Sequence, residues 1–164
     1  MPKQIRTVKG VVVTVDDDVF EDVNQYRWMT DAKGYTRRSV WNADKYKSDT
    51  VFLHRSIINA KKGELVDHIN GDVCDNRKEN LRIATRGQNR RNSKIPSTNT
   101  SGYKGVTHDK ETGRWKSQVR YNKKPVNLGR FSNKHDAARM YNFWAKDIYG
   151  EFARLNIINE TEAE

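Results

Sequence analysis

The clearest pattern of apolar and polar positions lies in the C-terminal third of the chain. Three segments rich in β-branched and aromatic residues, 103–107, 114–121 and 126–130, predict strands joined by polar turns. Ser132 can then cap a helix that ends at Gly150. We expect this helix to cover the apolar face of a small antiparallel sheet, because such a sheet is unstable without a cover. The residues at inward helical spacing are Ala137, Tyr141, Trp144, Ala145 and Ile148.

The pattern in the N-terminal half is shorter and less regular. The run VVVTV at 11–15 predicts a buried strand, and Asp16 or Asp17 can cap a short helix after it. Segments 35–40 and 50–53 predict further strands, and a helical turn follows the second of them. The inward-facing residues expected from the helix are Phe20, Val23 and Tyr26, and the helical turn runs through Ile57 and Ile58.

The two halves are separated by a stretch that has little to bury. SKIPSTNTSG, at 93–102, contains Ile95 as its one large apolar side chain and otherwise consists mainly of linker and turn residues. We therefore divide the chain into segments in this order: an N-terminal β-rich extension at 1–49, a central motif at 50–93, a linker at 94–101, a C-terminal domain at 102–156 and an acidic tail at 157–164.

The charge balance points to a polyanionic partner. The 164 residues include 31 Lys and Arg against 21 Asp and Glu, a net charge of +10, and nucleic acid is the first candidate for such a surface. The single Cys74, expected to be a free thiol, excludes an intramolecular disulfide and a multi-cysteine zinc site. No apolar run approaches the roughly 18 residues of a membrane span, and no hydrophobic signal segment opens the chain. We expect a cytoplasmic protein.

The segment VDHINGDVCDNRKENLRIATRGQNRRN combines groups suited to hydrolytic chemistry. Asp67 offers a hard anionic oxygen for Mg²⁺, and the neighbouring His68 can accept a proton at neutral pH. Residues 81–85 alternate like a strand, and 86–92 can form one or two helical turns. A strand, a loop, a second strand and a helix would bring Asn89, a neutral oxygen donor, back toward Asp67.

The order DH…N…N with DNRKENLRIAT between strongly resembles the HNH (His-Asn-His) nucleases of the ββα-metal fold, and is most similar to the phage and intron subgroup with Asn in place of the final His. The resemblance covers roughly 50–92. It implies that His68 is the general base and that Asp67 and Asn89 bind one Mg²⁺ or Mn²⁺ ion per active site. It also implies that Asn80 holds the loop between the strands so that His68 points correctly.

The remaining histidines have simpler interpretations. His54, in the segment LHRSI that often precedes this motif, is expected to pack or to brace a loop. His108 and His135 are expected at the solvated surface.

A second resemblance lies at 101–156. The segments YKGV, GRW, VNLGRF, DAARMYNFWAKDIYG and LN are similar to the Apetala-type DNA-binding domain of plant ethylene-response factors, a module that mobile HNH nucleases also carry. The resemblance implies that the three-stranded sheet lies in the major groove of DNA. Trp115 has two interpretations: its side chain contacts DNA, or it packs at the edge of the core. With the cationic run at 77–94, the candidate DNA-binding residues are Arg77, Arg82, Arg86, Arg90, Arg91, Lys104, Arg114, Trp115, Lys116, Arg120 and Asn127.

The sequence thus predicts an α+β protein: a ββα-metal HNH nuclease core with N-terminal strands, linked to a three-stranded antiparallel sheet packed on one helix. The predicted function is a metal-dependent, site-specific DNA endonuclease of the homing or nicking type, leaving a 5′-phosphate and a 3′-hydroxyl. We expect a phage-encoded monomer that binds double-stranded DNA, and a dimer stays an alternative. We expect neither a membrane nor an obligatory protein partner. The rival hypotheses are a DNA-binding regulator with an inactive nuclease motif and, with no recognition signature to favour it, an RNA-binding module. The role of 1–49 stays open.

Overall fold

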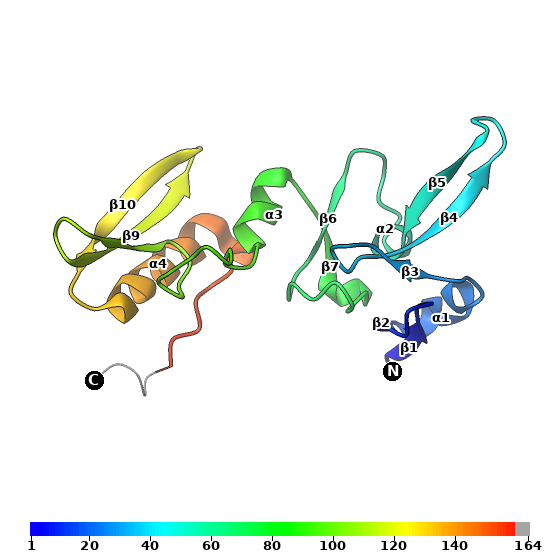
Figure 1. Ribbon diagram of the computed structural model, residues 1–164, viewed down its shortest axis with the longest axis horizontal. Helices are drawn as coiled ribbons and strands as arrows, with labels where there is room; N and C mark the ends of the chain where they lie inside the picture. Colours follow the sequence, from blue (N-terminus) through cyan, green and yellow to red (C-terminus); the bar gives the residue numbers. More distant parts are fainter. Residues whose placement is uncertain (160–164) are drawn as a thin grey trace. The chain divides into compact units, whose positions relative to one another are not determined.

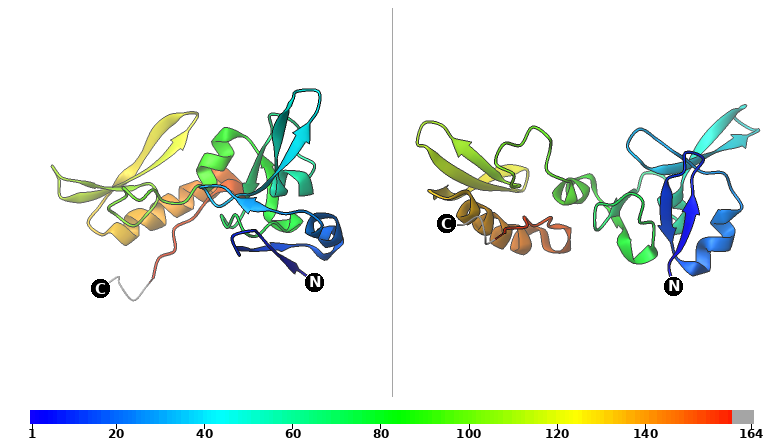
Figure 2. Two further views of the ribbon diagram at one scale, coloured as in Figure 1. Left: turned by 45° about the vertical axis from the view of Figure 1, so that its right-hand side comes forward. Right: turned by 60° about the horizontal axis from the view of Figure 1, so that its bottom comes forward.

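The computed structural model describes residues 1–159, which form two compact units. The first unit is Met1–Asn89 and the second begins at Arg90. Figures 1 and 2 show the elements of each unit from several sides. The boundary between the units falls inside a helix, a few residues before the linker predicted at 94–101. The predicted linker itself contains neither helix nor strand.

Two further findings concern the whole described chain. Residues 160–164 of the predicted acidic tail lie outside the described part. None of the helices in residues 1–159 is long and apolar enough to cross a bilayer.

The described residues of the first unit form small antiparallel sheets separated by short helices. Strand order is β1–β2 in one sheet, β3–β4–β5 in the next and β6–β7 in the last. The elements are β1 (Lys3–Arg6), β2 (Val12–Val15), α1 (Asp17–Asn24), β3 (Met29–Thr30), β4 (Thr36–Asn42), β5 (Lys47–Phe52), α2 (Leu53–Ile57), β6 (Leu65–His68), the 3₁₀ turn η1 (Lys78–Asn80), β7 (Leu81–Ala84) and α3 (Arg86–Asn92).

One hydrophobic core joins most of these elements. Val13 and Val15 of β2 are fully buried, so the buried strand predicted at 11–15 is confirmed. They pack in a single cluster with residues from both ends of the unit, namely Ile5, Val23, Trp28, Leu53, Ile57, Val66 and Leu81. The strands β6 and β7 are therefore held on the same core as the N-terminal strands, and burial of these apolar side chains supplies the main stabilising free energy.

The N-terminal region departs from the sequence prediction at its short elements. Tyr26 does not lie on the inward face of α1: it follows the helix, is 42% exposed, and its ring lies 3.8 Å from the guanidinium of Arg38. Strands β1 and β3 were not predicted, because each offers too few apolar positions to show a pattern. β1 nevertheless buries Ile5, which pairs with Val13 of β2.

The second unit contains one sheet and one long helix in its described part. The strands are β8 (Val106–Asp109), β9 (Arg114–Tyr121) and β10 (Lys124–Phe131), in the antiparallel order β10–β9–β8. The helix α4 (Lys134–Tyr149) is followed by the 3₁₀ turn η2 (Gly150–Phe152). α4 buries Ala137, Ala138, Tyr141 and Ala145 against the sheet residues Val106 and Val119. The small side chains let the helix approach the sheet closely.

The predicted exposure of two residues in this unit is wrong. His135 is buried rather than exposed, and its Nδ1 lies 3.0 Å from the hydroxyl of Tyr103. Trp144 is 39% exposed rather than part of the core, because the inward stripe of α4 is narrower than the apolar pattern of its sequence. The helix begins one residue later than expected, with Asn133 accepting a hydrogen bond from the His135 N–H at 2.7 Å.

The first strand of the sheet begins at Val106, not at Tyr103. The preceding turn contains Gly102 and Gly105, whose φ angles of 76° and 75° are costly for any residue with a Cβ. At Gly105 a Cβ would lie 2.0 Å from a ring carbon of Tyr141 and 2.7 Å from the carbonyl oxygen of Gln118. The turn therefore needs glycine at this position both for conformation and for space.

We expect Gly105→Ala to destabilise the second unit far more than Gly102→Ala. Both substitutions impose a similar backbone strain of about 1–2 kcal/mol, but a Cβ at position 102 would have no atom within 4 Å, so only Gly105→Ala adds a steric clash. The combined cost at Gly105 is about 3 kcal/mol or more. Hydrogen exchange of the β8–β10 amides measures the difference, and equal protection in the two variants would contradict it.

Candidate active site

Asp67 and His68 lie side by side in sequence at the end of β6, and both are almost completely buried, with 5% and 4% exposure. In the register of the β6–β7 pair, Asp67 is opposite Arg82 and His68 is opposite Leu81. Since successive side chains of a strand point to opposite faces, the carboxylate and the imidazole have different surroundings. The short β6–β7 pair thus fixes both groups through its backbone.

The carboxylate of Asp67 is held by its cross-strand neighbour. Arg82 donates to Asp67 Oδ2 from Nε at 3.0 Å and from Nη2 at 2.8 Å. Both side chains are largely buried. A buried carboxylate is costly unless it is paired and hydrogen-bonded, so the two hydrogen bonds from Arg82 offset the cost of burying Asp67.

The imidazole of His68 lies among rings and one amide. Its Nε2 lies 3.4 Å from Oδ1 of Asn76, and its ring centroid lies 5.3 Å from that of His54 and 6.0 Å from that of Tyr35. Burial lowers the pKa of His68, against the opposing effects of Asn76 and Asp67. The imidazole is therefore neutral at neutral pH and can accept a proton.

His54 packs against this imidazole. It is buried, with its ring 5.2 Å from Tyr35 and 5.6 Å from Phe52 between centroids. Burial, and then the neighbouring His68, lower the pKa of His54 to about 4. The packing role expected for His54 is confirmed, and the contact makes it a neighbour of the candidate general base.

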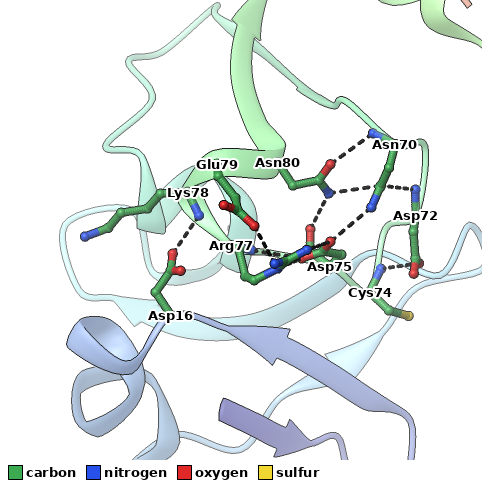
Figure 3. Close-up of polar contacts among 9 residues, drawn as sticks. All are labelled: Asp16, Asn70, Asp72, Cys74, Asp75, Arg77, Lys78, Glu79 and Asn80. Carbon is green, nitrogen blue, oxygen red and sulfur yellow. Dashed lines mark hydrogen bonds and ion pairs between the residues drawn. The ribbon is translucent and has the colours of Figure 1, made fainter. Parts of the chain in front are cut away.

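Asn80 closes the loop between β6 and β7 with its side chain. Its Oδ1 accepts from the backbone N–H of Asn70 at 2.9 Å, and its Nδ2 donates to Asn70 Oδ1 at 3.0 Å and to the Asp75 carbonyl at 2.8 Å. Asp75 in turn accepts from Arg77 Nε and Nη2, both at 2.8 Å (Figure 3). The loop is thus cross-linked by buried polar groups rather than by an apolar core.

The N-terminal strand β2 supports the same loop from outside. Thr14 donates its N–H to the Cys74 carbonyl and accepts from the Asn76 N–H, each at 2.8 Å. Asp16 Oδ2 accepts from the Lys78 N–H at 2.7 Å (Figure 3). Residues 1–49, whose role the sequence left open, therefore help to position the loop that faces His68.

Asn76 is a site residue that the sequence analysis missed. It is 1% exposed, donates from Nδ2 to the Val73 carbonyl at 3.1 Å, and directs Oδ1 toward His68. Nothing in the sequence separates it from the other polar residues of its loop. Only the contact with the imidazole identifies it.

Asn89 lies on the first turns of α3, in the same unit as Asp67, and is partly buried. A capping box fixes the start of this helix: the Gln88 N–H donates to Thr85 Oγ1 at 3.2 Å, and the Thr85 N–H donates to Gln88 Oε1 at 2.8 Å. Within residues 1–159 there is no group of three or more His, Cys, Asp or Glu side chains that could hold a metal. The candidate metal ligands are thus one carboxylate and one amide.

The cations predicted to bind DNA divide into engaged and exposed groups. Arg77 pairs with Asp75 and Glu79, Arg82 pairs with Asp67, and Arg91 lies 4.7 Å from the ring of Tyr149. These three have internal partners that a phosphate would have to displace. Of the arginines predicted to contact DNA in this run, Arg86 and Arg90 are exposed.

In the second unit the strand register places the residues predicted to contact DNA on two different faces of the sheet. Arg114, Lys116 and Arg120 alternate along β9 and share one face, with Asn127 of β10 opposite Gln118 on that same face. Trp115 points to the other face, where it packs against the cluster that contains Val106. The core-edge interpretation of Trp115 is the one that fits.

Lys104 is also used inside the second unit. Its Nζ donates to the carbonyl of Arg91 and, at 2.7 Å, to that of Ser93. Burial lowers the pKa of Lys104 to about 8. The side chain therefore stabilises the carbonyl groups at the end of α3, and in this conformation it does not reach outward to DNA.

Comparison with known proteins agrees with this geometry. The family model that matches, described as HNH endonuclease, covers residues 51–91, which include Asp67, His68, Asn80 and Asn89. The chain therefore contains an HNH endonuclease domain, which implies nuclease activity on DNA, typically with a divalent metal. Among its relatives is Protein 3.8 of Escherichia phage T7, 34% identical over 94 residues, which are 57% of this chain and 77% of the phage protein.

The chain is also similar to two other proteins. An uncharacterized HNH endonuclease of Acanthamoeba polyphaga mimivirus is 29% identical over 157 residues, 92% of this chain and 78% of the viral protein. An AP2-like ethylene-responsive transcription factor of Arabidopsis thaliana is 40% identical over 63 residues, 38% of this chain and 13% of the plant protein. No solved structure matches the chain significantly.

We expect Asn80→Ala to lower the free energy of unfolding of the first unit by about 1–3 kcal/mol, because it leaves the Asn70 N–H and the Asp75 carbonyl without their partner. Asn24→Ala is the matched control, since Asn24 is exposed at the end of α1. Denaturant unfolding measures both. Equal stability of the two variants would show that the loop does not depend on Asn80.

Proposed function

We propose that this protein is a divalent-metal-dependent DNA endonuclease of the homing or nicking type, with its active site at Asp67, His68 and Asn89. The observation that supports this most directly is the buried pair at the end of β6: a carboxylate whose charge is balanced by Arg82, beside an imidazole kept neutral by burial. A buried titratable pair of this kind is costly for stability alone and is typical of functional sites.

In the proposed mechanism His68 is the general base. It takes a proton from a water molecule, whose oxygen attacks the scissile phosphorus in line with the departing 3′ oxygen. The P–O3′ bond breaks and the departing 3′ oxygen takes a proton from solvent, so the products are a 5′-phosphate and a 3′-hydroxyl. Asn76 is a positioning residue in this scheme, because an amide oxygen near Nε2 restricts the orientation of the imidazole.

The donor set at the site fits a magnesium or manganese ion. Asp67 supplies a carboxylate oxygen and Asn89 an amide oxygen, both hard donors, and such ions commonly bind to one or two carboxylates while keeping several waters. When bound, the ion would stabilise the negative charge that develops on the phosphoryl group and the departing oxygen. Arg82 orients the Asp67 carboxylate through Oδ2.

The elements β6, β7 and α3 are the proposed ββα-metal core, and the proposed nuclease segment is 50–93. The second unit is the proposed Apetala-type DNA-binding domain, at 102–156, which would place the core on its target. Support comes from the cationic face of β9 and from the partial likeness to a plant transcription factor. Of the residues predicted to contact DNA there, Arg114, Lys116, Arg120 and Asn127 stay in the proposal.

A regulator that binds DNA without cutting it is the second candidate. The observation that favours it is the Asp67–Arg82 ion pair, because the same carboxylate would have to bind the metal. The presence of His68 and Asn89 together with Asp67 favours the enzyme, since a binding protein needs neither a general base nor metal ligands.

Nicking of a supercoiled plasmid separates the two candidates. We expect the protein to nick DNA with Mg²⁺ or Mn²⁺ and to stop in excess EDTA. His68→Ala should slow nicking by about 10²–10⁴-fold while leaving DNA affinity unchanged. His108→Ala, which removes an exposed imidazole elsewhere, is the control. DNA binding without metal-dependent nicking by the wild-type protein would favour the regulator.

The salt dependence of DNA binding tests the face of β9. If Arg114 and Arg120 contact phosphates, replacing each by Gln should reduce the slope of log affinity against log salt by about 1. Lys146→Gln, which removes an exposed cation from α4, should leave the slope unchanged. The same slope in all variants would remove this face from the DNA contact.

A further inference from the structure

The loop between β6 and β7 contains the one Asn-Gly pair of the chain, Asn70 and Gly71. The strand β6 ends at His68, so the pair follows the candidate general base closely. Asn-Gly is a reactive pair, because glycine has no Cβ to keep its backbone nitrogen away from the preceding carboxamide. Asn70 is exposed, so water can reach it. The loop that faces His68 therefore contains a pair of groups that can react with each other.

The folded loop engages the nitrogen that would attack. The N–H of Gly71 donates to the carbonyl of His68 at 2.9 Å. The nitrogen has to give up this hydrogen bond before it can lose its proton and approach the side chain of Asn70. Reaction therefore requires that the turn after β6 opens first, which is a local opening of the kind that exposes backbone amides to exchange.

The carboxamide that would be attacked is held at both of its polar atoms. Oδ1 of Asn70 accepts from the Asp72 N–H at 2.8 Å and from Asn80 Nδ2 at 3.0 Å. Nδ2 of Asn70 donates to Asp75 Oδ2 at 3.0 Å, and Figure 3 shows these contacts together. Asn80 is itself buried and bound to the Asp75 carbonyl. The hydrogen bonds that hold the loop thus also protect Asn70 from reaction.

We propose that Asn70 is a site of spontaneous deamidation whose rate is set by the opening of this loop. In the open loop the Gly71 nitrogen gives its proton to water and attacks Cγ of Asn70. The Cγ–Nδ2 bond breaks, and Nδ2 takes a proton from water and leaves as ammonia, which gives a five-membered succinimide. Water then adds to one of the two succinimide carbonyl carbons and opens the ring to aspartate or isoaspartate. The reaction needs no reactant other than water.

Either product would prevent the loop from closing as before. An aspartate at position 70 places a carboxylate where the amide donated to Asp75, so like-charge repulsion replaces a hydrogen bond. Isoaspartate also adds one carbon to the main chain between two anchored N–H groups, that of Asn70 on Asn80 and that of Gly71 on His68. The inference goes beyond the proposed function: deamidation would irreversibly release the loop that faces the candidate general base.

Peptide mapping by mass spectrometry, after incubation of the full-length protein at mildly alkaline pH, tests the site. In the folded wild-type protein Asn70 should deamidate at least about tenfold more slowly than in the protein denatured in urea. Asn80→Ala should raise the rate in the folded protein by about 5–150-fold, the factor that corresponds to a loss of about 1–3 kcal/mol in loop stability. Asn24→Ala should leave the rate at Asn70 unchanged. The exposed Asn122, which is followed by lysine, is the internal reference and should respond to neither substitution.

Two results would overturn the inference. One is a rate at Asn70 that is the same in the folded and the denatured wild-type protein, and the other is an unchanged rate in folded Asn80→Ala. If Asn80→Ala does not fold, the wild-type protein in urea below its unfolding transition takes its place. The rate at Asn70 should then rise steadily with urea, and a rate that rises only with global unfolding would contradict control by the loop.

The effect of the modification on the loop is measured with Asn70→Asp, which has the sequence of one product. Hydrogen exchange of the Gly71 and Asp72 amides should be at least about fivefold faster in this variant than in the wild-type protein. Asn122→Asp adds the same charge in the exposed turn between β9 and β10 and should leave both amides unchanged. Wild-type protection in Asn70→Asp would show that the aspartate product leaves the loop closed, against the inference. None of these measurements depends on whether the protein cuts DNA.

Discussion

The position of His68 depends on hydrogen bonds that hold the loop between β6 and β7 from two sides. Asn80 ties the loop to itself through Asn70 and the Asp75 carbonyl, and Thr14 of β2 binds the backbone at Cys74 and Asn76. The donors and acceptors of these hydrogen bonds are buried or partly buried, so leaving one of them without its partner would lower the stability of the loop. The imidazole, which meets the loop at Asn76, takes its orientation from this network.

Burial disfavours the charged form of both neighbouring groups of the site. For His68 it lowers the pKa, so the imidazole is in the neutral form that a general base requires. For Asp67 the same surroundings would disfavour the anion, and the cross-strand Arg82 offsets that cost. One short pair of strands thus supports a neutral base and an ion-paired carboxylate group at consecutive positions.

The parts of the fold that the sequence predicted are those with repeated apolar positions. The strand at 11–15, β9 and α4 each bury residues at regular spacing, so their patterns were visible. The strands β1 and β3 were missed because they are short and mostly polar, and their pairing partners lie elsewhere in the chain. Local pattern does not contain that information.

The same limit applies to the site. The motif residues Asp67, His68, Asn80 and Asn89 could be selected from sequence because their order and spacing are distinctive. The role of Asn76, the engagement of Lys104 with the end of α3 and the inward direction of Trp115 depend on the path of the chain and on strand register. No composition or spacing rule distinguishes an available cation from one that already caps a helix.

The shared core of the first unit bears on how this motif could be exchanged between proteins. Residues 51–91 match the family model, yet Ile5, Val13, Val15, Val23 and Trp28 supply much of the apolar surface against which they pack. A transplanted cassette limited to the matched stretch would leave Leu53, Val66 and Leu81 facing water. A recombination event that transfers a folded nuclease must therefore include the chain from β1 onward, although the family model matches residues 51–91 alone.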